Sequence, residues 1–173
     1  AYTSARMVTK HKGDWKYGKI EVRARLPHGR GIWPAIWMLP TDWKYGDWPK
    51  SGEIDIMEFV GYMPDSVFGS VHTGAYNHMI GTQSTKGQYF NDLLDTFHIY
   101  SIEWTADKVG FFIDGKKYHE FRNNGKGPEA WPFDQAFHLI LNVAVGGNWG
   151  ASKGMDESIY PQRMEVDYVR VYQ

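Results

Sequence analysis

Regular alternation of apolar and polar residues is the dominant period of this chain, and it restricts the fold more than any other feature. Residues 19–26 place Ile, Val, Ala and Leu at every second position, opposite lysine, glutamate and arginine, as in a strand with one buried face. Comparable segments are 67–73, 97–104, 137–145 and 163–172. No segment has a convincing period of 3.6 residues, although residues 89–94 have room for one helical turn. We therefore predict an all-β fold, with a two-sheet sandwich favoured over a barrel.

Turn residues support this interpretation. Asp114-Gly115 separates two strand-like segments, 109–113 and 116–121, and predicts a hairpin with a two-residue turn. We find no internal repeat, low-complexity tract or linker. The length of 173 residues is typical of one domain, so we predict a single domain over residues 1–173.

Charge and cysteine content exclude several classes of function. Lys and Arg total 19 and Asp and Glu total 20, and this near-neutral balance argues against nucleic acid or an anionic membrane as the main partner. The chain has no Cys, which excludes disulfides, zinc–thiolate sites and thiol nucleophiles. The longest apolar stretch, residues 31–39, is too short for a membrane span of ~20 residues.

Aromatic residues are unusually frequent, at 16% of the chain with eight Trp. A Trp side chain needs a hydrogen-bond partner for its indole N–H when it is buried. Exposed aromatic faces stack well on the flat apolar faces of sugar rings. The composition is therefore compatible with a carbohydrate site and equally with a β-rich core that is simply aromatic.

The most informative segment is a strand-like run with three carboxylates, residues 51–60. Glu53 and Asp55 are two positions apart and share a face of a strand. Strict alternation would place Glu58 on the opposite face, but one extra residue in a β-bulge would return it to the face of Glu53. Ile56-Met57 is the natural position for that bulge.

Adjacent carboxylates repel one another and raise each other's pKa, which a structural strand does not need. Retaining glycoside hydrolysis does need two neighbouring carboxyls, one as nucleophile and one that keeps a proton near neutral pH. The alternatives are a solvated acidic strand edge and a calcium site. The interleaved apolar residues favour a strand over a calcium-binding loop.

This segment also resembles the signature of the family 16 glycoside hydrolases, and further similar segments are 2–6, 17–21, 31–40 and 141–147. The signature here is Glu53-Ile54-Asp55-Ile56-Met57-Glu58. The resemblance implies a concanavalin-like jelly-roll β-sandwich of two antiparallel sheets with a sugar cleft on the concave face. It implies that Glu53 is the nucleophile, Asp55 the assisting acid and Glu58 the general acid/base. No cofactor is implied for catalysis.

The inserted Met57 is similar to the laminarinase branch, the endo-β-1,3-glucanases, and differs from bacterial lichenases. We therefore predict retaining endo-hydrolysis of internal β-1,3-glucosidic bonds in laminarin-type β-glucans. Agarase, carrageenase and porphyranase relatives share the insertion, so another β-glucan or a marine galactan stays open as the substrate. A transglycosylase and a non-catalytic carbohydrate-binding module on the same fold are further alternatives. A polymer cannot enter a cell intact, so we expect a secreted or periplasmic protein.

Several other residues are candidates for sugar contacts. Trp33 and Trp37 share a face of an extended run and are predicted to form a sugar platform, the alternative being that one of them is core. Asn142 is polar in an otherwise apolar strand and is a candidate sugar hydrogen-bonder. The resemblance implies that Arg6 contacts sugar hydroxyls, the alternative being a salt bridge. It also implies that His72 lies beside the acid/base, the alternative being an ordinary polar residue.

Two loop tryptophans, Trp43 and Trp48, are expected either to wall the cleft or to cover the sandwich. Asp167 matches the C-terminal part of a structural calcium site known in the family. Relative to the family, the domain is expected to be N-terminally shortened, because strands usually precede the segment at 2–6. Such a chain would have exposed sheet edges, for which we expect cover by a dimer, a partner or an exchanged strand.

Overall fold

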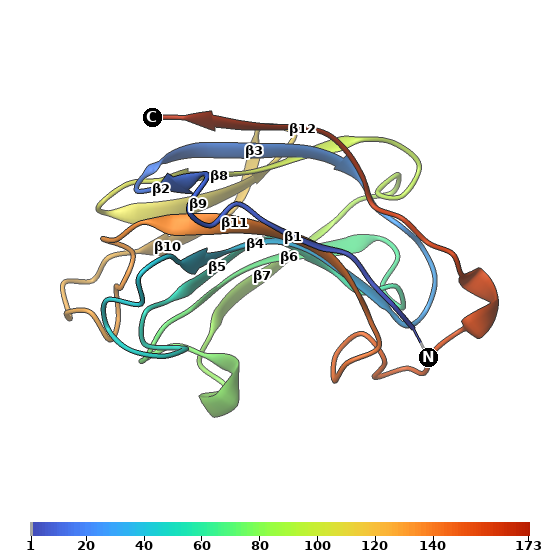
Figure 1. Cartoon of the computed structure of the whole chain (residues 1–173), viewed down its shortest axis with the longest axis horizontal. Coiled ribbons are helices and arrows are strands. Elements are labelled where there is room, and N and C mark those ends of the chain that lie inside the picture. Colours follow the sequence, from blue (N-terminus) through green and yellow to red (C-terminus); the bar gives the residue numbers. More distant parts are fainter. Residues whose placement is uncertain (1) are drawn as a thin grey trace.

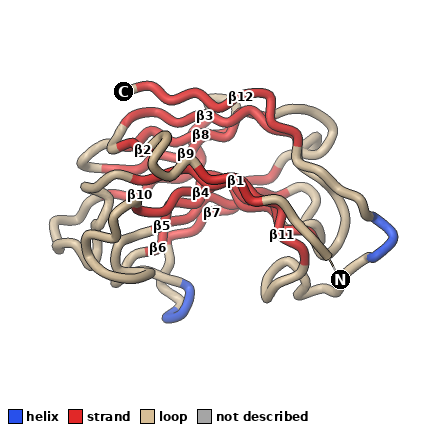
Figure 2. The backbone as a smooth tube through the Cα atoms, viewed as in Figure 1, coloured by secondary structure: helices blue, strands red, loops and turns tan. Residues whose placement is uncertain are grey.

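A computed structural model describes residues 2–173, and it has two antiparallel sheets stacked face to face. Strands account for almost all of the regular structure, as the red segments of Figure 2 show. The predicted all-β sandwich is therefore confirmed. Figure 1 shows that the larger sheet arches and that loops extend beyond both of its ends, on the side away from the smaller sheet.

The seven-stranded sheet has the order β1-β11-β4-β5-β6-β7, with β2 also paired to β11. Its strands are β1 (Arg6–Val8), β2 (Asp14–Trp15), β4 (Ile32–Pro40), β5 (Glu53–Phe59), β6 (Ser66–His72), β7 (Ser84–Tyr89) and β11 (Phe137–Val145). The five-stranded sheet has the order β10-β9-β8-β3-β12. Its strands are β3 (Gly18–Arg25), β8 (His98–Trp104), β9 (Lys108–Ile113), β10 (Lys116–Arg122) and β12 (Glu165–Tyr172).

The hydrophobic core lies between the two sheets and is strongly aromatic. Its largest fully buried side chains include Trp104, Phe111, Phe133 and Phe137. The indole N–H of Trp104 donates to the carbonyl of Phe133 at 3.0 Å, so this buried polar group is satisfied. A large part of the aromatic content thus serves the core, as one of the two interpretations of the composition predicted.

Local predictions are confirmed with one exception. The β9–β10 hairpin turns at Asp114-Gly115, and both residues have positive φ (49° and 76°), as a two-residue hairpin turn requires. Residues 89–94 were predicted to have room for one helical turn, and this was wrong. Strand β7 continues to Tyr89, and residues 91–95 form hydrogen-bonded turns that lead into β8.

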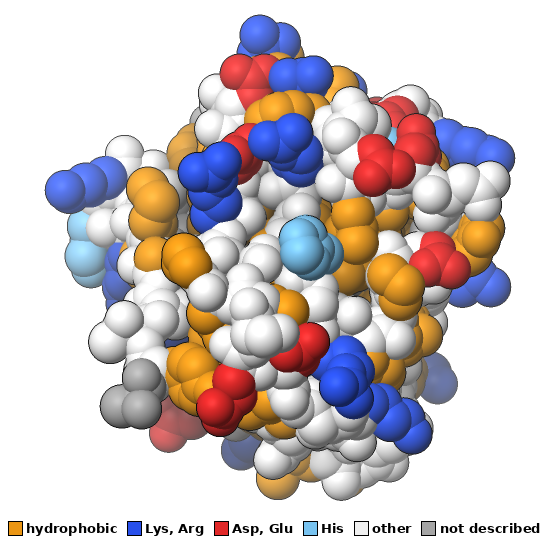
Figure 3. All heavy atoms as spheres, turned by 90° about the vertical axis from the view of Figure 1, so that its right-hand side faces the viewer, with side chains coloured by type: hydrophobic (Ala, Val, Ile, Leu, Met, Phe, Trp, Pro, Cys, Tyr) orange, Lys and Arg blue, Asp and Glu red, His pale blue; other side chains and the backbone are white. Residues whose placement is uncertain are grey.

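One end of the sandwich is mixed in charge. Figure 3 shows basic and acidic side chains interspersed over one end of the sandwich, in agreement with a net charge of −1. Edge strand β1 exposes Met7 (67%) and Val8 (47%), so apolar side chains lie at one border of the larger sheet. The helical elements of residues 2–173 are two short 3₁₀ turns, η1 (His78–Ile80) and η2 (Glu157–Ile159), and neither has the length of a membrane span.

Candidate active site

The three carboxylates lie on one face of β5 because the strand contains the predicted bulge. Glu53 pairs with His72 and Asp55 with Ser70 on β6, and the next pair on this ladder is Glu58 with Phe68. Two residues of β5, Ile56 and Met57, therefore oppose a single residue of β6 between these pairs. The ladder with β4 shifts at the same place. The extra residue returns Glu58 to the face of Glu53, as predicted.

The opposite face of β5 anchors this arrangement in the core. Ile54, Ile56, Met57 and Phe59 are each at most 1% exposed. Both residues of the bulge are thus packed in apolar surroundings, and a slip of one position would bring a carboxylate into the core. The geometry of the acid face is therefore fixed by burial of the other face.

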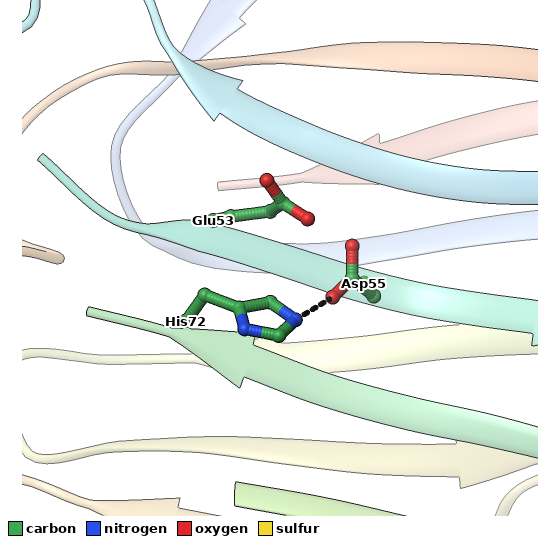
Figure 4. Close-up of side chains that lie close together, drawn as sticks. All are labelled: Glu53, Asp55 and His72. Carbon is green, nitrogen blue, oxygen red and sulfur yellow. Dashed lines mark ion pairs between the residues drawn. The ribbon is translucent and has the colours of Figure 1, made fainter. Parts of the chain in front are cut away.

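Each acid has a different nitrogen neighbour. The indole N–H of Trp48 donates to Oε2 of Glu53 at 2.7 Å, and that of Trp33 donates to Oε1 of Glu58 at 3.1 Å. Asp55 is 2% exposed, and its Oδ2 lies 3.3 Å from Nε2 of His72. Figure 4 shows Glu53 and Asp55 from β5 and His72 from β6 directed toward one another.

Burial sets the proton affinity of all three acids. It raises the pKa of Glu58 to about 7, with a further contribution from the charge of Glu53. It raises the pKa of Asp55 well above its usual range, assisted by the charge of Glu58. Burial also raises the pKa of Glu53, assisted by Asp55, while the Trp48 N–H acts in the opposite direction by stabilising the carboxylate. The three acids therefore hold protons near neutral pH. Because they interact, their apparent pKa values describe the three acids together and not each residue by itself.

The acids open into a cleft of about 760 Å³ on the outer face of the larger sheet. Its lining includes the three carboxylates and four indoles, together with a basic and an amide side chain: Glu53, Asp55, Glu58, Trp33, Trp37, Trp43, Trp48, Arg6 and Asn142. This volume is in the range of small-ligand sites. Both loop tryptophans, whose role the sequence left open, thus wall the cleft.

Strands β1, β4 and β11 bring three of the predicted residues together at one side of the cleft. Trp37 donates its indole N–H to Oδ1 of Asn142 at 2.7 Å, and the Arg6 guanidinium lies over the Trp37 ring at 5.0 Å. Arg6 and Asn142 are also partners in the β1–β11 register. This cluster presents an aromatic face with hydrogen-bonding groups beside it, which is a suitable surface for a sugar ring.

His72 lies beside the acid cluster, on the neighbouring strand β6. It is 7% exposed, and its near acidic neighbour is Asp55 rather than Glu58. Its ring packs against Trp48, with centroids 6.0 Å apart, and against His78 at 5.2 Å. His72 therefore supports the wall of the cleft from behind, and sugar contact by this residue stays a prediction.

Asp167 is on β12, in the other sheet, and its carboxylate accepts from Arg23 at 2.5 Å. Calcium takes six to eight oxygen ligands. One carboxylate that is already paired with a guanidinium does not by itself suit that ion. Calcium binding near Asp167 stays a prediction.

Sequence analysis missed His78, which also lines the cleft. It begins the η1 turn, and its ring lies against Trp48 with centroids 5.0 Å apart. Burial, assisted by His72, lowers the pKa of His78. The position follows from a loop that returns toward the carboxylates, and no spacing in the sequence signals it.

Comparisons with known proteins agree with this geometry. Residues 1–170 match the family described as "Glycosyl hydrolases family 16". The chain is 54% identical to a "Beta-glucanase" of Rhodothermus marinus, over 99% of this chain and 62% of that protein. It is 42% identical to "Glucan endo-1,3-beta-glucosidase A1" of Niallia circulans, over 99% of this chain and 26% of that protein.

The fold comparison gives the same result. The X-ray structure of the laminarinase from Rhodothermus marinus superposes with a TM-score of 0.94 at 51% identity, and the match covers 97% of this chain and 70% of that one. The chain thus spans about three fifths of the length of the Rhodothermus relative. With a family match over almost its whole length, this chain belongs to glycoside hydrolase family 16.

Proposed function

We propose that this chain hydrolyses internal β-1,3-glucosidic bonds in laminarin-type β-glucans, with retention of configuration. The observation that carries the proposal is the bulge at Ile56-Met57, because it brings the three acids to one face of β5 and into an aromatic cleft. The names of the Rhodothermus and Niallia relatives support the β-1,3-glucan substrate.

The first step uses Glu53 and Glu58 together. Glu53 attacks the anomeric carbon as a carboxylate while Glu58, whose pKa is raised to about 7, gives its proton to the leaving glycosidic oxygen. The C–O bond to the leaving sugar breaks, and an ester between Glu53 and the remaining sugar forms. The Trp48 N–H stabilises the ionised form of Glu53 before attack.

The second step reverses the roles. Glu58, now ionised, takes a proton from water, and the resulting nucleophile displaces Glu53 from the anomeric carbon. Two displacements at the same carbon return the original β configuration. Asp55 is the most buried of the three acids, and a proton kept there allows Glu53 to ionise with less repulsion.

Aromatic side chains bind the polymer in this proposal. Trp33 and Trp37 offer faces to sugar rings, and Arg6 and Asn142 offer hydrogen bonds to hydroxyls beside them. The polysaccharide is too large to enter a cell intact, so we place the substrate, and the protein, outside the cytoplasm.

The test is to incubate the purified chain with laminarin, barley β-glucan, agarose and carrageenan and to measure released reducing ends, with Glu53→Gln as the blank. We expect short oligosaccharides from laminarin, with the β-anomer appearing first by NMR, and none from the variant. Release from agarose or carrageenan alone would replace the substrate. Binding of laminarin without any hydrolysis would favour the carbohydrate-binding module.

A further inference from the structure

Two carboxylates of the acid cluster lie close to the imidazole of His72, and these three groups are all of types that ligate metal ions. Within residues 2–173, Glu53, Asp55 and His72 are the one set of at least three metal-ligating side chains whose donor atoms all lie within 4.8 Å of one another. Figure 4 shows the three side chains close together, with the ion pair between Asp55 and His72 as a dashed line.

The contact between Asp55 and His72 has the dimensions of a metal site. Their nearest atoms, Oδ2 and Nε2, are 3.3 Å apart. Two ligands at ~2.0–2.1 Å from a tetrahedral zinc ion lie about 3.3 Å apart, and their lone pairs then point to the ion and not to each other. Asp55 is 2% exposed, and its Oδ2 accepts no hydrogen bond within residues 2–173, so the His72 ring nitrogen is an ion-pair partner that a shared metal ion would replace.

The third ligand lies on the side of the cleft. Trp48 donates to Oε2 of Glu53, so Oε1 of Glu53 is the oxygen that would ligate an ion. Glu53 and Asp55 both line the cleft, so an ion would enter from there and keep its fourth position open to water.

The ligand types select the class of ion. Calcium and magnesium prefer all-oxygen sites, whereas a set of one imidazole and two carboxylates suits zinc and its neighbours among the first-row transition metals. No ion pair with Lys or Arg compensates Glu53, Asp55 or Glu58 among the residues that the structure describes, and a divalent cation would supply that charge.

We propose that Glu53, Asp55 and His72 form a binding site for a divalent transition-metal ion of the zinc class, and that the bound ion occupies the nucleophile and inhibits the chain. Nε2 of His72 ligates through its lone pair, and the proton kept on Asp55 is released to solvent on binding. The inhibition rests on the proposed function, whereas the binding does not.

Calorimetric titration of the tag-free, EDTA-stripped chain with ZnCl₂ tests the binding directly. We expect one ion per chain, and an affinity weaker by about 100-fold or more in His72→Gln, because loss of a direct ligand should cost at least as much as loss of an outer-shell partner. Glu21→Gln on β3 is the control, since it removes a carboxyl of the other sheet and should bind zinc with unchanged affinity.

Two further measurements keep the result decisive. Titration with Co²⁺ should produce visible absorption bands of a tetrahedral nitrogen–oxygen site, and Asp55→Asn should remove them in a chain whose circular dichroism is unchanged. Equal zinc affinity of His72→Gln and the parent chain would overturn the proposal, as would loss of binding in His78→Gln alone. Zinc binding by a chain that hydrolyses no polysaccharide would support the site while the proposed function failed.

Discussion

Strands β3 and β5 are both interior strands that bury one face in the common core, yet the charges on their outward faces have opposite surroundings. On β3 the charged side chains are paired. Lys19 Nζ lies 2.6 Å from Glu21, and Arg23 and Arg25 each lie 2.5 Å from a carboxylate of β12. These groups remain partly exposed, so water and the opposite charge both stabilise them.

On β5 the outward charges are all of one sign and lie in a walled cleft. Their neighbours are the indole N–H groups of Trp33 and Trp48 and the ring of His72. Neutral donors compensate a buried carboxylate less well than a guanidinium does, so the acids keep protons instead. The unfavourable burial of like charges is thus confined to one strand, β5, where a retained proton is chemically useful.

The largest effect that would sharpen this contrast is on activity. Glu58→Gln should lower kcat on laminarin by about 10²–10⁴-fold, because the leaving oxygen loses its proton donor. An aryl glycoside with a good leaving group should lose less in its first step, which burst kinetics would show. Glu21→Gln on β3 is the control and should leave kcat unchanged. Equal losses in the two variants would contradict the difference between the strands.

The second effect is on stability against pH. The pKa of Glu58 is raised from 4.5 to about 7, so this acid favours the folded state fully below pH 4.5 and that contribution is lost as the pH rises through 7. The span corresponds to about 3 kcal/mol as an upper bound. The contribution of Glu165 has the opposite pH dependence, because its hydrogen bond from Arg25 lowers its pKa. This contribution is present above the pKa of Glu165 in the unfolded chain and is lost as the pH falls through the lower pKa of the folded chain.

Urea unfolding between pH 4 and 8 checks this prediction. The free energy of unfolding of Glu58→Gln minus that of the parent chain should increase between pH 4.5 and 7 and then level off. A difference that is constant over this range would show that Glu58 is not protonated preferentially in the folded chain.

The third effect is on the support of the bulge. Gly69 lies on β6 opposite the bulge, and a Cβ there would meet the Tyr118 hydroxyl and, at 2.8 Å, the Phe111 ring. We expect Gly69→Ala to lower the free energy of unfolding by about 1–3 kcal/mol and to lower kcat as the bulge shifts. Adding Tyr118→Phe to this variant should restore part of the stability and part of kcat, because it removes the hydroxyl that the new Cβ meets. That hydroxyl has no hydrogen-bond partner within residues 2–173, so its loss should cost little.

Gly110→Ala on β9 is the matched glycine of the other sheet. Its Cβ would meet the edge of Phe112 at 3.1 Å, a milder contact. Gly110→Ala should therefore lose less thermal stability and less kcat than Gly69→Ala. An equal loss of kcat in Gly110→Ala would remove the special role of the bulge.

The smallest effect is expected on β3. Arg25 pairs with Glu165 in a partly exposed ion pair, and such pairs contribute about 0–1 kcal/mol. Arg25→Gln should change the free energy of unfolding within that range, less so in high salt, and leave hydrolysis unchanged. A loss of several-fold in kcat would show that the smaller sheet is coupled to the cleft.

The sequence predicted the strands well because alternation is a local property. The β3 segment, the β9–β10 hairpin and the bulge of β5 all follow from residue order and the period of two. The bulge in particular was predictable, because the three carboxylates can share one face of the strand only if one extra residue lies between Asp55 and Glu58.

The loops were not predictable in this way. Trp48 donates to Glu53, and His78 packs on Trp48, because two irregular segments fold back over the sheet. The position of His72 against Asp55 also depends on the β5–β6 register, which a single strand does not encode. Residues 89–94 lacked a clear period, and their turns are set by the connection to β8.

The bulge of β5 has a consequence for insertions and deletions in the gene. Elsewhere in this strand, one codon more or less would exchange the buried and outward faces of every residue beyond it. At Ile56-Met57 the strand absorbs the additional residue, and deletion of either one would leave Glu53, Asp55 and Glu58 at strictly alternate positions. Deletion of a single codon therefore keeps the three acids on one face at this point alone in β5. Chains with and without the extra residue can thus interconvert by mutation without passing through a form whose acids face the core.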